Sequence, residues 1–442
     1  MSGVADRVEP VVARIDRRAP GARDFGLRFW DGSELPPPPG AGSGLTFVVR
    51  SPDAFAYALR QPNELGLGRA WVSGALDLEG DLERGLALRE RFQGLKLSAA
   101  DRLAALRAAA RAGAVHLRPP AVPASEARVG GGRRHSLRRD RVAVRHHYDV
   151  SNAFYRMVLG PTMVYSCAYF SSPDDTLEEA QERKLEVICR KLRLRPGERL
   201  LDIGCGWGSH VLHAAREHGV RAVGVTLSEP QAALARARIR DAGLADRCEI
   251  RVADYREVDD GPYDKVVSVG MYEHVGRARL GEYVGRIKRV LRAGGLFLNH
   301  GIVRVKPRPW DKHSFIGRYV FPDGELHPMG AVVDAMERAG LEIRDDESLR
   351  EHYALTLRRW MANLAANRDA AVAEAGEERE RVWRLYMTGS ALAFEAGEIS
   401  VHQVLALKPG APHELPLARE ALLAGLGIRH QDRVKPFLTP DA

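Results

Sequence analysis

A run of three closely spaced glycines limits what this chain can fold into more than any other feature. The segment RLLDIGCGWGSHVLHAA (199–215) places them between a short apolar run and an amphipathic one. The first run predicts a buried strand, and the second predicts a helix with Val211, Leu212 and Ala215 on one face. Glycine lacks a Cβ and a helix start presents free N–H groups, so the turn predicts a backbone cradle for a nucleotide-like ligand. A tight connection without a ligand is the alternative.

The sequence after this turn alternates between strand-like and helix-like segments. A predicted strand at 222–225 precedes a predicted helix at 229–242, and two further apolar runs follow. This alternation predicts the α/β fold class with a doubly wound parallel sheet. The glycine spacing is G-x-G-x-G, and Thr226 stands where a dinucleotide enzyme usually carries an acidic residue. Asp254 follows the third strand, as in class I methyltransferases, so the block is similar to an S-adenosylmethionine (SAM) site.

Length and composition restrict the class of protein further. The 442 residues are enough for two cores. No apolar run reaches the roughly 18 residues that a membrane span needs, and the charged N-terminal segment is unlike a secretory signal. Because no cysteine shows C-x-x-C spacing, we expect reduced thiols of a cytoplasmic protein and neither disulfides nor metal ligands. The cysteines are Cys167, Cys189, Cys205 and Cys248.

Positive charge gathers in one stretch of the chain, whose net charge is +8. Residues 118–145 contain many arginines together with proline and glycine clusters, a composition that cannot build a core. We expect a basic linker, which is either simply solvated or a surface for the anionic phosphates of lipids or nucleic acids. The expected division is a smaller α+β domain at 1–117, the linker at 118–145, a large α/β domain at 146–408 and a tail at 409–442.

A helix is expected immediately before the linker, at 98–117. Leu103, Leu106 and Ala110 recur on one face of this helix, and arginines occupy the other faces. The pattern suits a helix that lies on an anionic membrane surface, and packing of the apolar face on the N-terminal domain is the alternative. The arginines are Arg102, Arg107 and Arg111.

Motifs of the region 146–408 make it similar to the cyclopropane-fatty-acyl-phospholipid synthase family. YSCAYF (165–170), TLEEAQERK (176–184) and DIGCGWG (202–208) occur in the family's order without large gaps. The segment PNELGLGRAWVSGALDLEGDL (62–82) resembles the lipid-engaging N-terminal domain of bacterial members. It also resembles the actinobacterial branch linked to methyl-branched fatty acids, including tuberculostearic acid. A nucleic-acid substrate is not expected, because GMYEHVG stands where base-amine methyltransferases carry [ND]-P-P-[YF].

The resemblance implies a SAM-dependent enzyme that adds a methylene carbon across the cis double bond of an unsaturated phospholipid acyl chain. The double bond attacks the sulfonium methyl group and leaves a carbocation, from which a bound bicarbonate ion removes a proton while water is excluded. Proton loss after a hydride shift gives instead a 10-methylene chain, which a separate reductase would convert into a 10-methyl branch. A lipid-binding protein without activity is the remote alternative.

The resemblance also implies roles for particular residues. The bicarbonate cage is matched by Cys167, Glu273, His300, Tyr353 and the backbone of Ile302. Taken one at a time, each has a structural explanation, such as a small buried thiol or a packing aromatic ring, and only their combination supports the role. The residues implied for SAM are Tyr165, Ser166, Asp202, Gly204, Gly206, Gly208, Thr226, Gln231, Asp254 and Tyr255.

A phospholipid substrate implies a protein that reaches the membrane. We expect a cytoplasmic chain that associates peripherally with the inner face of the membrane and contacts unsaturated phospholipids there. A homodimer is one option, and a reductase partner is expected only for the 10-methylene product. The candidates for contact with anionic lipid are the arginines of 118–145 together with the basic face of the helix at 98–117. Replacement of Arg133, Arg134, Arg138 and Arg139 with glutamine is expected to weaken that contact.

Overall fold

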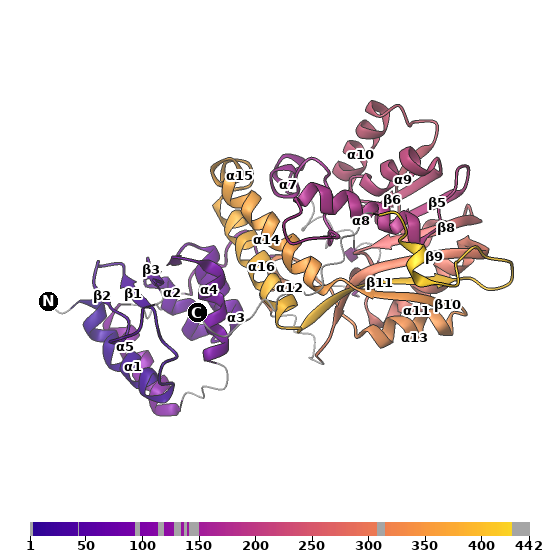
Figure 1. Cartoon of the computed structure of the whole chain (residues 1–442). Helices are drawn as coiled ribbons and strands as arrows, with labels where there is room; N and C mark the ends of the chain where they lie inside the picture. The colour runs from indigo at the N-terminus through magenta and orange to yellow at the C-terminus, as the bar shows by residue number, and fades with distance from the viewer. Residues whose placement is uncertain are drawn as a thin grey trace. The chain divides into compact units, whose positions relative to one another are not determined.

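The computed structural model describes eight stretches of the chain, which form two compact units (Figure 1). The smaller unit comprises residues 1–127, 313–320 and 376–392, and the larger unit comprises 128–312, 321–375 and 393–442. Two short segments that were expected in the large α/β domain therefore cluster with the N-terminal part. The described residues are 3–42, 44–92, 98–113, 119–127, 134–136, 139–140, 150–306 and 314–426.

The smaller unit combines a mixed four-stranded sheet with helices, as the α+β prediction for this part requires. The strand order is β2-β1-β3-β4, in which β1 and β3 are parallel and the other pairs are antiparallel. Phe29, Val49, Tyr57 and Ala70 belong to its apolar core. The strands are β1 (Gly26–Phe29), β2 (Glu34–Leu35), β3 (Thr46–Val49) and β4 (Leu76–Glu79). The helices are α1 (Val4–Arg18), α2 (Asp53–Arg60), α3 (Glu64–Val72), α4 (Leu82–Arg91), α5 (Ala99–Arg111), α12 (Phe315–Tyr319) and most of α16 (Glu377–Glu395).

The two later segments join the smaller unit through specific contacts. The indole Nε1 of Trp71 donates to the carbonyl of Arg381 (3.0 Å), and Arg381 Nε donates back to the carbonyl of Trp71 (2.6 Å). Glu126, which lies in the expected linker, is buried and pairs with both Arg69 (2.8 Å) and Arg318 (2.7 Å). Because breaking a buried ion pair is costly, this triad fixes α12 to α3.

A seven-stranded sheet forms the centre of the larger unit, as the alternating segments predict. Its order is β10-β11-β9-β8-β5-β6-β7, in which β5 to β9 are parallel and β11 is antiparallel to both neighbours. Helices cover both faces of the sheet (Figure 1). The strands are β5 (Arg199–Ile203), β6 (Arg221–Thr226), β7 (Cys248–Val252), β8 (Tyr263–Val269), β9 (Leu291–Arg304), β10 (Glu342–Ser348) and β11 (Ile399–Leu407). The helices are α7 (Asn152–Leu159), α8 (Leu177–Lys191), α9 (Ser209–His218), α10 (Glu229–Asp241), α11 (Leu280–Val290), α13 (Met329–Arg338), α14 (Arg350–Ala366) and α15 (Arg368–Ala375).

Alternate side chains of β5 point to opposite layers of the larger unit. Leu200 packs in one core cluster with residues of α8, α9 and α10, while Leu201 and Ile203 pack in the other with residues of α11 and α13. This alternation buries the strand on both faces, which is the doubly wound arrangement. The carboxyl ends of the parallel strands meet at one edge, where an open α/β sheet binds its ligands.

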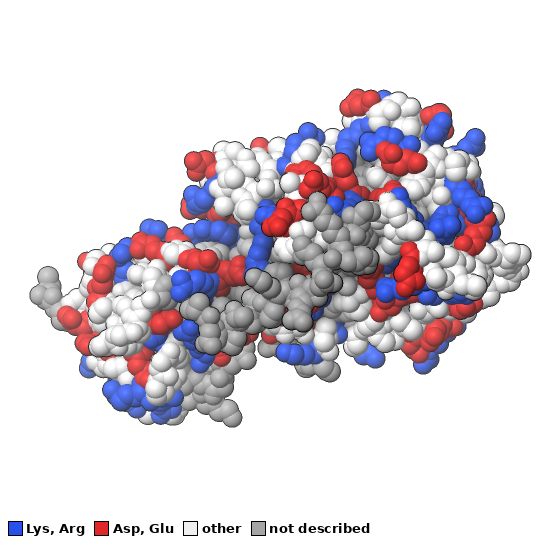
Figure 2. Space-filling model, in the orientation of Figure 1, with Lys and Arg blue, Asp and Glu red and all other residues white. Residues whose placement is uncertain are grey.

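Acidic partners balance much of the positive charge on the surface. In Figure 2, Lys and Arg alternate with Asp and Glu over the described residues of the face shown. Arg134 and Arg139 both pair with Asp323, at 3.3 and 2.5 Å. Arg133 and Arg138 lie outside the described residues. The two described arginines of the expected lipid contact are therefore bound to a carboxylate of the larger unit, and they do not form a free basic surface.

Candidate active site

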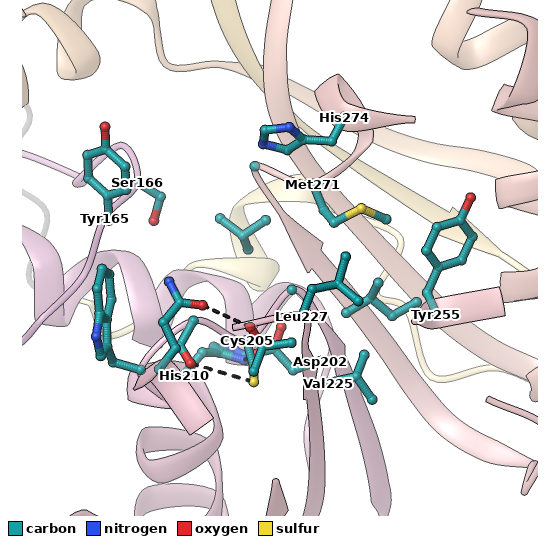
Figure 3. Close-up of a pocket in the computed structure, with 18 of the residues that line it drawn as sticks. Tyr165, Ser166, Asp202, Cys205, His210, Val225, Leu227, Tyr255, Met271 and His274 are labelled. Carbon is teal, nitrogen blue, oxygen red and sulfur yellow. Dashed lines mark hydrogen bonds and ion pairs between the residues drawn. The ribbon is translucent and has the colours of Figure 1, made fainter. Parts of the chain in front are cut away.

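A pocket opens at the carboxyl ends of β5, β6 and β8 in the larger unit. Tyr165 and Ser166 lie on one side of it, Met271 and His274 lie on the opposite side, and Asp202 lies at the end of the sheet below them (Figure 3). The glycine-rich turn thus faces a hollow, as the sequence predicts. Nine of the ten residues predicted for SAM line the pocket: Tyr165, Ser166, Asp202, Gly204, Gly206, Thr226, Gln231, Asp254 and Tyr255.

The glycines of the turn serve different purposes. Gly206 has a φ of +54°, and a Cβ built on it would meet no atom within 4 Å, so its missing side chain leaves room for a ligand. A Cβ on Gly208 would lie 3.0 Å from the Cβ of Ala235 on α10. Gly208 was predicted to contact SAM, but it does not line the pocket. Its role is the close approach of α9 to α10.

Lys184 of α8 is a pocket residue that the sequence analysis missed. It is 2% exposed, and its Nζ donates to Ser166 Oγ at 2.9 Å. Burial lowers the pKa of this ammonium group to about 8. No carboxylate of the described residues lies within ion-pair distance of it. A buried ammonium group needs a negative partner, and the pocket that it lines is the place for one.

The far end of the pocket carries a paired carboxylate. Arg256 Nε and Nη2 each donate to Asp254 at 2.7 Å, and Nη2 also pairs with Asp140 at 2.9 Å. Thr226 Oγ1 donates to Gln231 Oε1 at 2.8 Å. Arg256 was not predicted, although it is only two residues from Asp254. It fixes the orientation of the carboxylate expected to hold adenine and leaves lone pairs for one further donor.

Three of the predicted cage residues lie together beside the end of β8. Glu273 follows β8, and its Oε1 accepts the backbone N–H of Ile302 at 2.8 Å. His300 lies two residues before Ile302 on β9, and its Nδ1 lies 3.1 Å from Nε2 of Gln403 on β11. With the Gln403 amide donating to Nδ1, the proton of a neutral His300 sits on Nε2. The side chain of Glu273 and the Nε2–H of His300 are then both available to a ligand.

The other two cage residues are linked to these three through β11. Cys167 Sγ lies 3.7 Å from the carbonyl of Leu349, which also accepts the backbone N–H of Tyr353 at 3.1 Å. The N–H of Leu349 in turn donates to the carbonyl of Val401 at 2.8 Å, and Val401 is the register partner of Ile302. All five predicted residues therefore belong to one neighbourhood.

Burial governs the electrostatics of the cage. Glu273 Oε2 and His300 Nε2 are buried and have no hydrogen-bond partner among the described residues. Desolvation raises the pKa of Glu273 to about 7 and lowers that of His300 well below its usual value. It also raises the pKa of the Cys167 thiol. Because an unsatisfied buried polar atom costs about 1–3 kcal/mol, two such atoms indicate a place for a polar ligand.

The cage borders the pocket without lining it. Ser166, which precedes Cys167, is a pocket residue, and so is Gly270, whose N–H donates to the carbonyl of His300 at 2.8 Å. A group bound in the cage would therefore sit next to residues that line the pocket.

Comparison with known proteins agrees with this site. The mycolic acid cyclopropane synthetase family matches residues 135–404, which is more than half of the chain. A probable fatty acid methyltransferase of Pseudomonas putida is 42% identical over 401 residues, which cover 89% of this chain and 95% of the relative. A probable fatty acid methyltransferase of Mycobacterium tuberculosis is 44% identical over 386 residues, which cover 84% of this chain and 90% of the relative.

Solved structures extend the agreement to the fold. The cyclopropane synthase MmaA2 from Mycobacterium tuberculosis is 34% identical, with a TM-score of 0.58 over 61% of this chain and 98% of its own. The mycolic acid cyclopropane synthase CmaA1, solved with S-adenosylhomocysteine (SAH) and CTAB, is 35% identical, with the same TM-score and coverage. The fold and the pocket define a class I SAM-dependent methyltransferase. The chain belongs to the mycolic acid cyclopropane synthetase family, which confirms the resemblance inferred from its motifs.

Proposed function

We propose that this methyltransferase adds a methylene carbon across the cis double bond of an unsaturated phospholipid acyl chain to form a cyclopropane ring. SAM, when bound, supplies an electrophilic methyl group. The observation that supports methylation followed by proton removal is the pair of orphaned buried atoms, Glu273 Oε2 and His300 Nε2, beside the pocket. The fatty acid methyltransferases that match most of the chain support a lipid substrate.

A small oxyanion such as bicarbonate fits the donor set of the cage. His300 Nε2–H donates to it, and the Glu273 carboxylate accepts the O–H of the anion, so that the anion can take up a proton. Ile302 was expected to take part in the cage through its backbone, and its N–H donates to Glu273. Ile302 is therefore a positioning residue. The buried surroundings of His300 and Cys167 keep water from a carbocation.

The same methylation with a 10-methylene product is the second candidate. The relatives named cyclopropane mycolic acid synthase cover 59% of this chain, whereas those named fatty acid methyltransferase cover 84% and 89%. The names of the longer matches do not specify a ring. A separate reductase would then reduce the methylene group to a methyl branch.

Mass spectrometry of membrane lipids tests both candidates. Cells that express the chain are expected to contain acyl chains with one additional CH2, and fragmentation distinguishes a ring from a 10-methylene group. Co-expression of a reductase changes only the methylene product. Lipids identical to those of cells that express the Glu273→Gln variant would contradict the proposed function.

The carboxylate of SAM is the partner that we propose for Lys184. The Lys184→Met variant is expected to bind SAH roughly 10- to 100-fold more weakly, the value of a lost charged hydrogen bond. Its affinity for 5′-methylthioadenosine, which lacks the carboxylate, should stay unchanged in calorimetry. Lys265→Met, which removes a buried lysine outside the pocket, is the control. An equal loss for both ligands would exclude the carboxylate as the partner of Lys184.

Helix α5 is the surface that we propose for docking on an anionic bilayer. Leu103 and Leu106 are each 46% exposed, so about half of each side chain on the apolar face predicted from the sequence is open to solvent. Arg102, Arg107 and Arg111 are exposed on the same short helix. No helix in the described part of the chain could span a bilayer. Apolar side chains flanked by arginines suit the interface of an anionic membrane.

The cytoplasmic location and the homodimer stay predictions.

Liposome flotation measures this docking. The triple variant Leu103→Ser, Leu106→Ser, Arg107→Gln is expected to bind anionic vesicles at least 10-fold more weakly and to keep its affinity for SAH. Binding by the parent chain should fall as salt rises, because the charge attraction is screened over about 8 Å at physiological ionic strength. A triple variant on α4, Arg84→Gln, Leu86→Ser, Arg89→Gln, is the control. Equal binding by the parent and the α5 variant would rule out this helix as the docking surface.

A further inference from the structure

A cluster of metal-ligand side chains lies between α8 and α9, outside the pocket. Cys189 comes from α8, and His213 and His218 come from α9. Each offers one ligand atom, and these atoms lie within 4.8 Å of one another. Thiolate sulfur and imidazole nitrogen are the ligands that zinc takes most often in proteins.

A carboxylate outside this group of three contacts both of its imidazole rings. Glu186 Oε2 lies 3.1 Å from Nε2 of His213 and 2.9 Å from Nε2 of His218. Glu186 and Cys189 lie three residues apart, so they share one face of α8. Arg190 holds the other oxygen of Glu186 at 2.7 Å. In protein metal sites, carboxylates beside histidine ligands set the ring orientation in this way.

The helices that carry these groups pack against each other in an apolar core. Cys189 is fully buried and belongs to the same core cluster as Val211 and Leu212 of α9. Its thiol is free of any disulfide, and its Sγ lies 3.7 Å from Nε2 of His210. Glu186 can hold both imidazole rings without a thiol nearby. The buried thiol of Cys189 is therefore the feature that these hydrogen bonds do not explain.

We propose that Cys189, His213, His218 and Glu186 form a site for a divalent cation of the zinc class, which ties α8 to α9. The sequence analysis expected no metal ligands, because no cysteine shows C-x-x-C spacing. The site does not depend on the proposed lipid substrate. It lies behind the pocket, since α8 carries Lys184 and α9 begins at the glycine-rich turn.

Cobalt titration of the full, tag-free chain tests the site. After treatment with a chelator, the protein is expected to bind one equivalent of Co2+ with a near-ultraviolet thiolate-to-cobalt absorption and visible bands of a tetrahedral ion. Zn2+ should remove these bands and raise the Tm. Absence of stoichiometric binding of either ion by the parent chain would overturn the proposal.

Variants locate the ion. Cys189→Ser should lose the thiolate absorption, and Cys248→Ser, which removes a thiol on β7, should keep it. His218→Gln lies at the end of α9, where a change disturbs the core least, and should weaken Co2+ binding at least 10-fold. SAH binding by each variant verifies that it is folded. Bands that persist in both Cys189→Ser and His218→Gln would place the ion elsewhere and refute the site.

Discussion

Replacing Glu273 with glutamine is expected to lower turnover by about 10²-fold or more while SAH affinity stays unchanged. Loss of a positioned partner in proton transfer has an effect of this size. Glutamine keeps the shape of the side chain, but when its oxygen accepts the Ile302 N–H, an NH2 donor stands where Glu273 Oε2 would accept the O–H of the anion. Glu273 does not line the pocket, so the cofactor should not sense the change.

The Glu273→Gln substitution is expected to lower turnover, but it should not lower the stability of the fold at alkaline pH. The pKa of Glu273 is raised to about 7 by burial, whereas the unfolded chain titrates near 4.5. Between these values the unfolded chain has released its proton and the native chain keeps it, so the free energy of unfolding falls as pH rises. This loss is on the order of 3 kcal/mol when complete. The Glu273→Gln variant lacks this loss, and its Tm at pH 8 should equal or exceed that of the parent.

Turnover, Tm and SAH calorimetry across pH 5–9 separate these effects. The parent chain should gain activity as pH rises through about 7, where the Glu273 carboxyl ionises. Glu282→Gln, on the exposed side of α11, serves as the matched control. A Glu273→Gln variant that turns over like the parent, or that loses SAH binding together with activity, would remove Glu273 from the cage.

A valine at Gly206 should abolish binding of SAM and SAH. The Cβ and its two methyl groups would enter the space that the turn leaves for a ligand, since no protein atom lies within 4 Å of that position. The positive φ of +54° adds backbone strain, which could by itself destabilise the chain.

A matched variant separates occupancy of the pocket from strain. Gly243 follows α10 with a φ of +67°, has no atom within 4 Å of its Cβ position and does not line the pocket. Gly243→Val therefore carries similar strain without blocking the ligand, and it should bind SAH like the parent. Equal SAH affinity in the Gly206→Val variant would mean that the turn has only a structural role.

Local pattern was enough to predict the parallel sheet and the glycine-rich turn that faces the pocket. The strand at 222–225 and the helix at 229–242 lie within two residues of β6 and α10. Resemblance to known methyltransferases assigned Thr226 and Asp254 to SAM, and both line one pocket because carboxyl ends of parallel strands share an edge. The cage residues also came from the family resemblance, since Cys167 and Tyr353 carry no distinctive local signal.

The remaining features depend on partners that are distant in the sequence. Lys184 lies four residues before Ile188 on the buried face of α8, so a lysine within an apolar stripe was the available signal. The pattern of α5 predicted an apolar face, but it could not indicate that Leu103 stays 46% exposed. Glu126 reads as part of a solvated linker until Arg318 is brought beside it.

The smaller unit is assembled from three separate pieces of chain, which has a consequence for protein engineering. A fragment that begins at residue 128 would lack Trp71. The buried guanidinium of Arg381 would then lack the carbonyl that accepts its hydrogen bond. The fragment would also leave Arg318 without Glu126. The catalytic half therefore cannot be excised with one cut. A chimera that exchanges the N-terminal region with a relative must carry α12 and most of α16 with it, so recombination at a single junction is expected to give insoluble products.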